Sequence, residues 1–82
     1  MATKKQKDHA WDNAKKIRGR NPESWRRDTQ GNIIRHGSYG TQGDYGWEVD
    51  HKNPIAKGGT EHLRNIQALQ WEVNREKSDK KK

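Results

Sequence analysis

An aspartate and a histidine stand side by side in the second half of the chain, and two asparagines follow them. Asn65 lies fourteen residues beyond His51, and Asn74 lies nine residues further on. Carboxylate and amide oxygens are ligands of the kind that Mg²⁺ and Mn²⁺ prefer. An imidazole has an unperturbed pKa of about 6.5, so its neutral fraction can accept a proton near pH 7. The types of Asp50, His51, Asn65 and Asn74 are therefore ones that metal-assisted hydrolysis can use.

Each of these four residues also has an ordinary structural interpretation. Taken singly, Asp50 would be a capping or ion-paired residue at a strand end, and His51 a structural hydrogen-bonding residue. Asn74 would be a solvent-exposed helix residue, and Asn65 a loop residue held by hydrogen bonds. The combination and its spacing, rather than any one residue, favour the chemical interpretation.

The acid and the imidazole need a strand that ends where they stand. A strand-like run at residues 47–49 leads into the pair, and Pro54 and the pair Gly58–Gly59 then break regular structure. Neighbouring strand residues point to opposite faces. Asp50 and His51 can therefore face one ligand only if the strand ends there, and we expect it to do so.

A second strand and a helix are expected to fold over the pair. The apolar run at 66–69 predicts the strand, and the helix formers after it predict a helix from residue 70 or 71 to about residue 78. Asn74 would lie in its first or second turn, with the amide oxygen directed at the strands. Arg75 and Lys77 would project toward solvent or phosphate.

Two further elements are predicted upstream of residue 47. A helix is expected from Asp8 to Gly19, because apolar residues recur at helical spacing between them. The segments 25–28 and 32–35 flank a turn that contains Gly31, which predicts a β-hairpin.

The length of the chain allows one domain. We expect it over residues 8–78, between a disordered basic tail at 1–7 and a disordered lysine tail at 79–82. Only 26% of residues are apolar and there is no Phe, so the core must be small and rely on the four tryptophans. The absence of Cys excludes disulfides and thiolate zinc sites. No apolar run has membrane-spanning length and no signal peptide is visible, which indicates a cytoplasmic protein without a membrane partner.

The formal net charge of +7 favours a polyanionic partner, nucleic acid first. Lysine tails that only keep the protein soluble would be the simpler explanation. They do not account for the charge, because cationic residues also lie in the body of the chain, among them Arg18, Arg20, Arg26, Arg27, Arg35, Lys52, Lys57, Arg64, Arg75 and Lys77.

Three spaced elements, DHxxPxxxGG, NIQxL and NxxK, together resemble the motif of HNH endonucleases in its DH–N–N form. The resemblance covers about 31 of the 82 residues and is more specific than a single short motif. It implies a ββα-metal (His-Me finger) core at about residues 45–78, inside an α+β domain with an N-terminal helix and an extra hairpin. It also implies hydrolysis of DNA phosphodiester bonds, by nicking or cleaving, with one divalent cation.

The resemblance assigns a role to each residue of the motif. Asp50 and Asn74 would be the metal ligands, His51 the general base, and Asn65 the residue that holds the loop and so orients the base. Mg²⁺ or Mn²⁺ is the expected ion, with Zn²⁺ or Ni²⁺ as the alternatives. The chain departs from many family members because it lacks paired CxxC motifs, so their structural zinc is excluded.

DNA is the expected partner, with RNA left open, and a larger protein partner could supply specificity in a bacterial or phage setting. The candidates for phosphate contacts are Lys52, Lys57, Arg64, Arg75 and Lys77, each of which alone would be an ordinary solvated charge. The alternative function is a non-catalytic basic nucleic-acid-binding module that retains the ββα fold. A basic scaffold or ribosome-associated protein would explain the charge but not the motif spacing.

Overall fold

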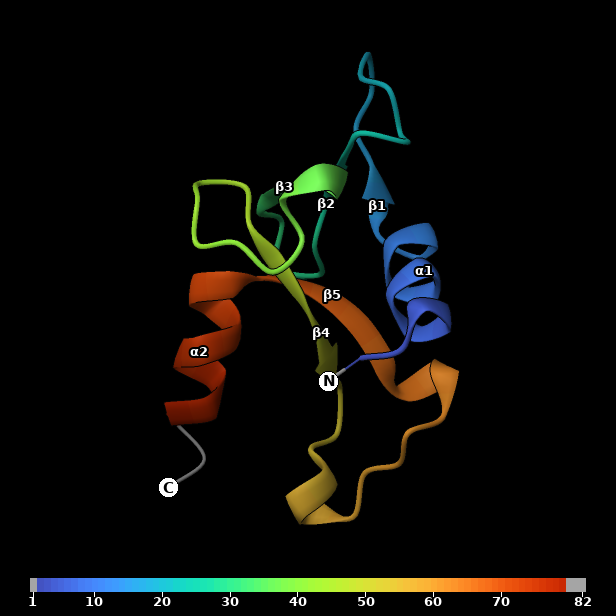
Figure 1. Ribbon diagram of the computed structural model, residues 1–82, viewed down its shortest axis with the longest axis vertical. Coiled ribbons are helices and arrows are strands. Elements are labelled where there is room, and N and C mark those ends of the chain that lie inside the picture. Colours follow the sequence, from blue (N-terminus) through green and yellow to red (C-terminus); the bar gives the residue numbers. More distant parts are fainter. Residues whose placement is uncertain (1, 80–82) are drawn as a thin grey trace.

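The computed structural model describes residues 2–79 and has an α+β fold, as predicted (Figure 1). Within these residues there are two helices and two antiparallel sheets. Neither helix is long and apolar enough to cross a membrane. The elements, in chain order, are α1 (Lys4–Asp12), β1 (Lys15–Lys16), β2 (Trp25–Arg27), β3 (Ile33–Arg35), β4 (Trp47–His51), β5 (Ile66–Gln70) and α2 (Trp71–Asp79).

Strands β4 and β5 form an antiparallel pair, and α2 follows β5 directly. The predicted second strand and final helix are thus confirmed, within one residue at each end. The first strand ends at the expected pair, because β4 stops at His51. Both residues of the pair still lie in the ladder, since His51 pairs with Ile66, so their side chains point to opposite faces, contrary to the expectation that they face one ligand. Helix α2 can begin without a loop because the Gln70 side chain accepts hydrogen bonds from the backbone N–H groups of Glu72 and Val73, at 3.0 and 3.1 Å.

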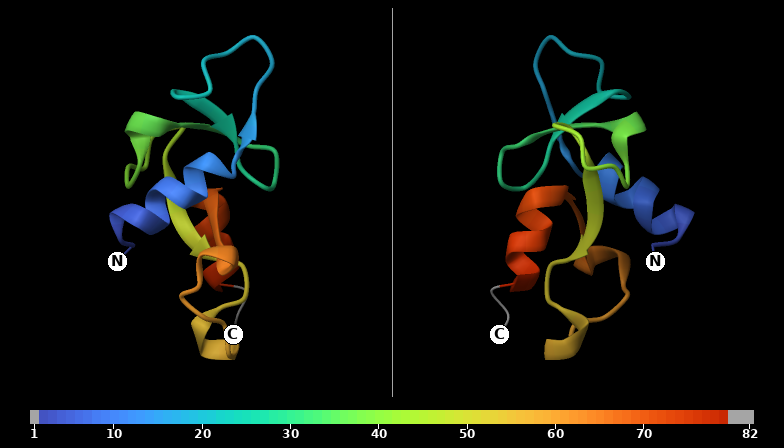
Figure 2. Two further views of the ribbon diagram at one scale, coloured as in Figure 1. Left: turned by 90° about the vertical axis from the view of Figure 1, so that its right-hand side faces the viewer. Right: turned by 60° about the vertical axis from the view of Figure 1, so that its left-hand side comes forward.

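The two helices cover opposite faces of the β4–β5 pair (Figures 1 and 2). Helix α1 places Trp11 against Trp47, with ring centroids 5.3 Å apart, and Trp47 is fully buried. Leu69 stands opposite Glu48 in the strand register, on the other face, where α2 packs. Both faces of this short sheet are therefore occupied, which limits the side chains that can reach solvent to those at its ends.

Helix α1 begins earlier and ends earlier than predicted. Thr3 and Gln6 form a reciprocal capping box, so the helix starts at Lys4 and not at Asp8. Residues 4–7 are consequently helical, which corrects the predicted disordered tail over that part. The helix ends at Asp12 and not at Gly19, because the chain leaves it to pair as β1 with β2. Of the lysine tail predicted at 79–82, residue 79 is the last of α2, and residues 80–82 lie outside the described part of the chain.

The predicted hairpin is present as β2 and β3, and β1 adds a third strand that the sequence did not indicate. Arg26 of β2 is buried, and its guanidinium donates to the backbone carbonyls of Trp11, Asp12 and Pro22 at 2.8 to 3.0 Å. These bonds tie the end of α1 to the three-stranded sheet.

A single buried carboxylate connects that sheet to β5. Asp28 is 3% exposed, and its Oδ1 accepts from the N–H groups of Gln30 and Asn32 in the hairpin turn, at 2.9 and 2.8 Å. Its Oδ2 accepts from the N–H of Gln70 at 2.8 Å. Asp28 therefore sets the position of the hairpin relative to the strand pair.

Asp28→Ala should lower the free energy of unfolding by about 3 kcal/mol, because it leaves buried N–H groups without an acceptor. The measurement is urea unfolding followed by tryptophan fluorescence. Asp44→Ala, at an exposed carboxylate, is the control and should change stability by less than about 0.5 kcal/mol. Equal losses in the two variants would contradict the connecting role of Asp28.

Candidate active site

The two predicted metal ligands face the same side of β4. Glu48 and Asp50 are two residues apart on the strand and point to the face that α2 covers. From α2, Asn74 donates through Nδ2 to Glu48 Oε1 at 2.9 Å, which leaves its amide oxygen available as a ligand. The structure therefore gathers Asp50 and Asn74 on one face, together with Glu48.

Lys77 lies directly against Asp50, which corrects the expectation that it projects toward solvent. Its Nζ is 2.6 Å from Asp50 Oδ2 and donates to the His51 carbonyl at 2.7 Å. Lys77 is three residues beyond Asn74 on the same helix face, and the nearly buried Asp50 carboxylate needs polar partners. Gln67 supplies the other one, with Nε2 at 2.8 Å from the same oxygen.

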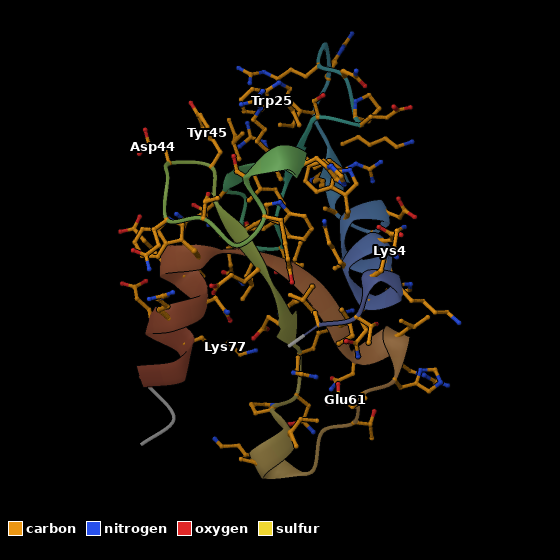
Figure 3. All side chains as sticks on the ribbon, in the orientation of Figure 1. Lys4, Trp25, Asp44, Tyr45, Glu61 and Lys77 are labelled. Carbon is orange, nitrogen blue, oxygen red and sulfur yellow. The ribbon has the colours of Figure 1, made fainter. Side chains whose placement is uncertain are left out.

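The imidazole of His51 lies on the opposite face of β4 from Asp50. Its Nε2 is 2.8 Å from Glu61 Oε1, and the His51 side chain is 30% exposed. Lys77 and Glu61 accordingly lie on opposite sides of the end of β4 (Figure 3). The structure thus brings His51 next to Asp50 in the chain but separates their side chains by the strand itself.

Glu61 is held from two sides, by His51 and by α1. Gln6 donates through Nε2 to Glu61 Oε1 at 3.1 Å. The hydrogen bond from His51, and then the one from Gln6, lowers the pKa of the Glu61 carboxyl. Glu61 is therefore a carboxylate at neutral pH and can only accept, so His51 Nε2 carries the hydrogen. In the neutral ring, this leaves Nδ1 as the proton acceptor.

Asn65 closes the loop between β4 and β5. Its Oδ1 accepts from the Asn53 N–H at 2.8 Å, and its Nδ2 donates to the carbonyls of Asn53 and Thr60 at 3.0 and 2.7 Å. Gly59 passes so close to the Asn53 carbonyl that a Cβ would overlap it. These are contacts of a loop-holding residue, and the proposed effect of Asn65 on the base stays a prediction.

A cleft of about 700 Å³ opens beside this face, between the loop, the hairpin turn and α2. Lys52, Lys57 and Lys77 line it, as does Gln67, which contacts Asp50. Three of the five cations predicted to contact phosphate therefore border one concavity.

The other two predicted phosphate contacts lie outside that cleft. Arg75 stacks on Trp71, with the guanidinium carbon 5.5 Å from the ring centre, and its Nη2 is 3.7 Å from Glu48 Oε2. Arg64 is exposed and borders a small hollow in the loop beside Asn65. Arg75 thus already has a protein partner, whereas the Arg64 guanidinium forms no salt bridge or hydrogen bond within residues 2–77.

The donor set on the α2 face fits a hard divalent cation with few protein ligands. Among the side chains of residues 2–77, no three His, Cys, Asp or Glu gather as a metal centre. A site here would thus use the carboxylate of Asp50 and the amide oxygen of Asn74, with water and phosphate in the other positions. The Lys77 ammonium against Asp50 shows that this face accepts a positive charge.

The motif did not identify three side chains that complete the site. Glu48 could have been found from strand alternation, because it is two residues before Asp50. Glu61 and Gln6 carried no comparable signal, since their contact joins residues 55 apart in the sequence.

Comparisons with protein-family models, with curated proteins and with solved structures find no match to this chain. A function for this protein is therefore inferred from the geometry at β4 and α2 and from the spaced motif.

The lowered pKa of Glu61 predicts a pH dependence of its contacts. A depressed carboxyl pKa means that the contact is complete above the ordinary value and is lost as pH falls through the value in the folded protein. Carboxyl ¹³C NMR should find the Glu61 midpoint below the ordinary value in the native protein. The midpoint should rise in His51→Ala, and less in Gln6→Ala, because His51 makes the larger contribution.

Lys16→Ala is the control for this titration and should leave the Glu61 midpoint where it is in the native protein. A midpoint that does not move in His51→Ala would show that the two side chains are not paired in solution.

Proposed function

We propose that this protein is a metal-dependent endonuclease of the HNH type, which hydrolyses phosphodiester bonds of DNA by nicking or cleaving. In this proposal β4, β5 and α2 form the ββα-metal core. The observation that carries it is the arrangement at the end of β4. Asp50 contacts Lys77 of α2, on the face where Asn74 contacts Glu48. His51, the next residue, presents its imidazole on the other face, and its Nδ1 has no hydrogen-bond partner among the side chains of residues 2–77.

The positions of His51 and Asp50 on opposite faces of β4 match the geometry of a nucleophilic displacement at phosphorus. The attacking and leaving oxygens lie roughly in line on the two sides of the phosphorus atom. A base for the attacking water and a site for the leaving oxygen must then also lie on two sides. A phosphate at the end of β4 would have His51 on one side and Asp50 with Asn74 on the other, so the alternation of the strand separates the two functions.

His51 would act through Nδ1. This nitrogen takes one proton from the attacking water as the new P–O bond forms, and the bond from phosphorus to the 3′ oxygen breaks. The imidazolium that results carries hydrogen on both nitrogens. Glu61 stabilises that cation through Nε2, and Gln6 holds Glu61 in place from α1.

Asp50 and Asn74 would hold the divalent ion, which is Mg²⁺ or Mn²⁺ by ligand type. When bound, it supplies stabilisation of the negative charge on the phosphate and the leaving oxygen. Lys77 has to release Asp50 Oδ2 for this, and its ammonium then becomes available to a phosphate in the adjoining cleft. The net charge of +7 favours the approach of the polyanion.

The native protein should convert supercoiled plasmid to nicked or linear forms with Mg²⁺ or Mn²⁺, and EDTA should stop the reaction. His51→Ala should reduce the rate at least about 100-fold, because general-base catalysis contributes that much or more. Gel electrophoresis of the plasmid measures both effects, and His9→Ala, on α1, is the matched control.

Cleavage that persists in EDTA, or at the native rate in His51→Ala, would refute the proposed mechanism. Plasmid binding without cleavage under all metal conditions would instead favour a non-catalytic nucleic-acid-binding module.

Glu61→Gln should lower kcat about 10- to 100-fold with little change in KM, because partners that orient a reactive side chain typically contribute this much. The amide can donate as well as accept, so the His51 tautomer is no longer fixed. Imidazole ¹⁵N NMR at a pH where the ring is neutral should detect a mixture of tautomers, whereas Glu61→Asp should retain part of both the rate and the signal. Glu23→Gln is the control at an exposed site, and an unchanged tautomer in Glu61→Gln would contradict the positioning role.

A further inference from the structure

A second cleft, of about 420 Å³, lies between the end of α1, the hairpin turn and β5. Its apolar floor consists of residues that belong to the core, including Ala14 and Ile66. Its rim carries three cations from three different segments, which are Lys15 of β1, Arg27 of β2 and Lys52 after β4. The volume falls within the range of small-ligand sites in proteins.

Two of these cations face each other directly. Lys15 and Arg27 are register partners in the β1–β2 ladder, so their side chains leave the sheet on the same face. Like charges in directly opposed positions destabilise a sheet. Among the side chains of residues 2–77, neither forms a salt bridge, and Lys52 forms none either. The fold therefore holds three cations at this cleft that form no ion pair with those residues.

The single carboxylate that lines the cleft is already engaged. Both oxygens of Asp28 accept backbone N–H groups, as described above. Arg27 is oriented by a bond from Nη1 to the Gly31 carbonyl at 2.8 Å, which keeps its guanidinium at the rim. An anionic ligand would supply a counter-charge to Lys15, Arg27 and Lys52.

The neighbouring pair in the same ladder provides a contrast. Lys16 is the register partner of Arg26, whose buried guanidinium is used by backbone carbonyls of the fold. Lys16 does not line the cleft, although it is exposed like Lys15 and adjacent to it. The pair that lines the concavity is thus Lys15 with Arg27, and the buried guanidinium of the other pair is taken up by the fold.

The second cleft adjoins the one beside the α2 face. Lys52 and Gln67 line both, and Gln67 contacts Asp50 on one side and Thr29 of the hairpin turn on the other. A chain of phosphates that passes the α2 face can therefore continue past Lys52 toward Lys15 and Arg27.

We propose that this cleft binds the phosphodiester backbone of the nucleic-acid strand that flanks the cut bond, with Lys15, Arg27 and Lys52 as its phosphate contacts. The inference rests on the proposed function and extends its substrate site onto the three-stranded sheet. That sheet then serves to hold substrate as well as to brace the core.

The test measures binding without cleavage. Fluorescence anisotropy with labelled single-stranded and duplex DNA, in EDTA and in the His51→Ala background, keeps the probe intact. Lys15→Gln and Arg27→Gln should each weaken binding about 5- to 10-fold at moderate salt. Each should also reduce the slope of log affinity against log salt by about one phosphate contact.

Lys16→Gln is the matched control, because it removes the same charge from the next residue and should change affinity less than about twofold. The melting temperature of Lys15→Gln should equal or exceed that of the parent, since one of two opposed charges is gone. Equal losses in Lys15→Gln and Lys16→Gln would overturn the inference. So would a polyglutamate peptide that binds with the same dependence on Lys15 and Arg27.

The outcome is separable from that of the proposed function. If the native protein fails to cut plasmid while DNA binding depends on Lys15 and Arg27, the nuclease proposal fails and the binding cleft stands. If the native protein cuts plasmid and both variants bind DNA with unchanged affinity, the reverse holds.

Discussion

The alternation of side chains along β4 is the constraint on which the site depends. Because the strand stays paired with β5 as far as His51, residues 50 and 51 must point to opposite faces. Each face is then covered by a different helix, α1 on one and α2 on the other. The acid is therefore held by Lys77 from α2 and the imidazole by Glu61, which α1 in turn holds through Gln6.

This division gives the two helices different parts in the proposed chemistry. Helix α2 carries Asn74 and Lys77, so it controls the side on which a cation would bind. In the first turn of helix α1, Gln6 contacts Glu61, and Glu61 in turn contacts His51, the proposed base. Residues 4–7, which the sequence predicts to be part of a disordered tail, are in this way connected to the end of β4.

The pairing of charged side chains also connects the fold with the proposed function. The acidic side chains nearest the site have partners, with Asp50 on Lys77, Glu48 on Asn74 and Glu61 on His51. The basic residues of the clefts mostly do not, and Lys15 stands directly opposite Arg27. The carboxylates of the candidate site are thus held by hydrogen bonds or ion pairs, whereas Lys15, Arg27 and Lys52 form no salt bridge among the side chains of residues 2–77.

The sequence alone determined the parts of this protein that depend on local spacing. Apolar runs and glycine turns located β4, β5, α2 and the β2–β3 hairpin, because strand and helix periodicity is a property of neighbouring residues. The same spacing selected Asp50, His51, Asn65 and Asn74 as candidate site residues. Only the tertiary structure decided that Asp50 and His51 face opposite ways, since the end of a strand is set by the ladder that Ile66 completes.

The contacts of Lys77 with Asp50, of Gln6 with Glu61 and of Lys15 with Arg27 were likewise decided by the tertiary structure. Each joins residues that are distant in sequence, up to 55 positions apart, and no local pattern encodes such a meeting. Long flexible side chains such as Lys77 also have several directions open to them, and the buried carboxylate selects one. The types of the candidate site residues can therefore be predicted from the sequence, whereas their partners are set by the packing of the folded chain.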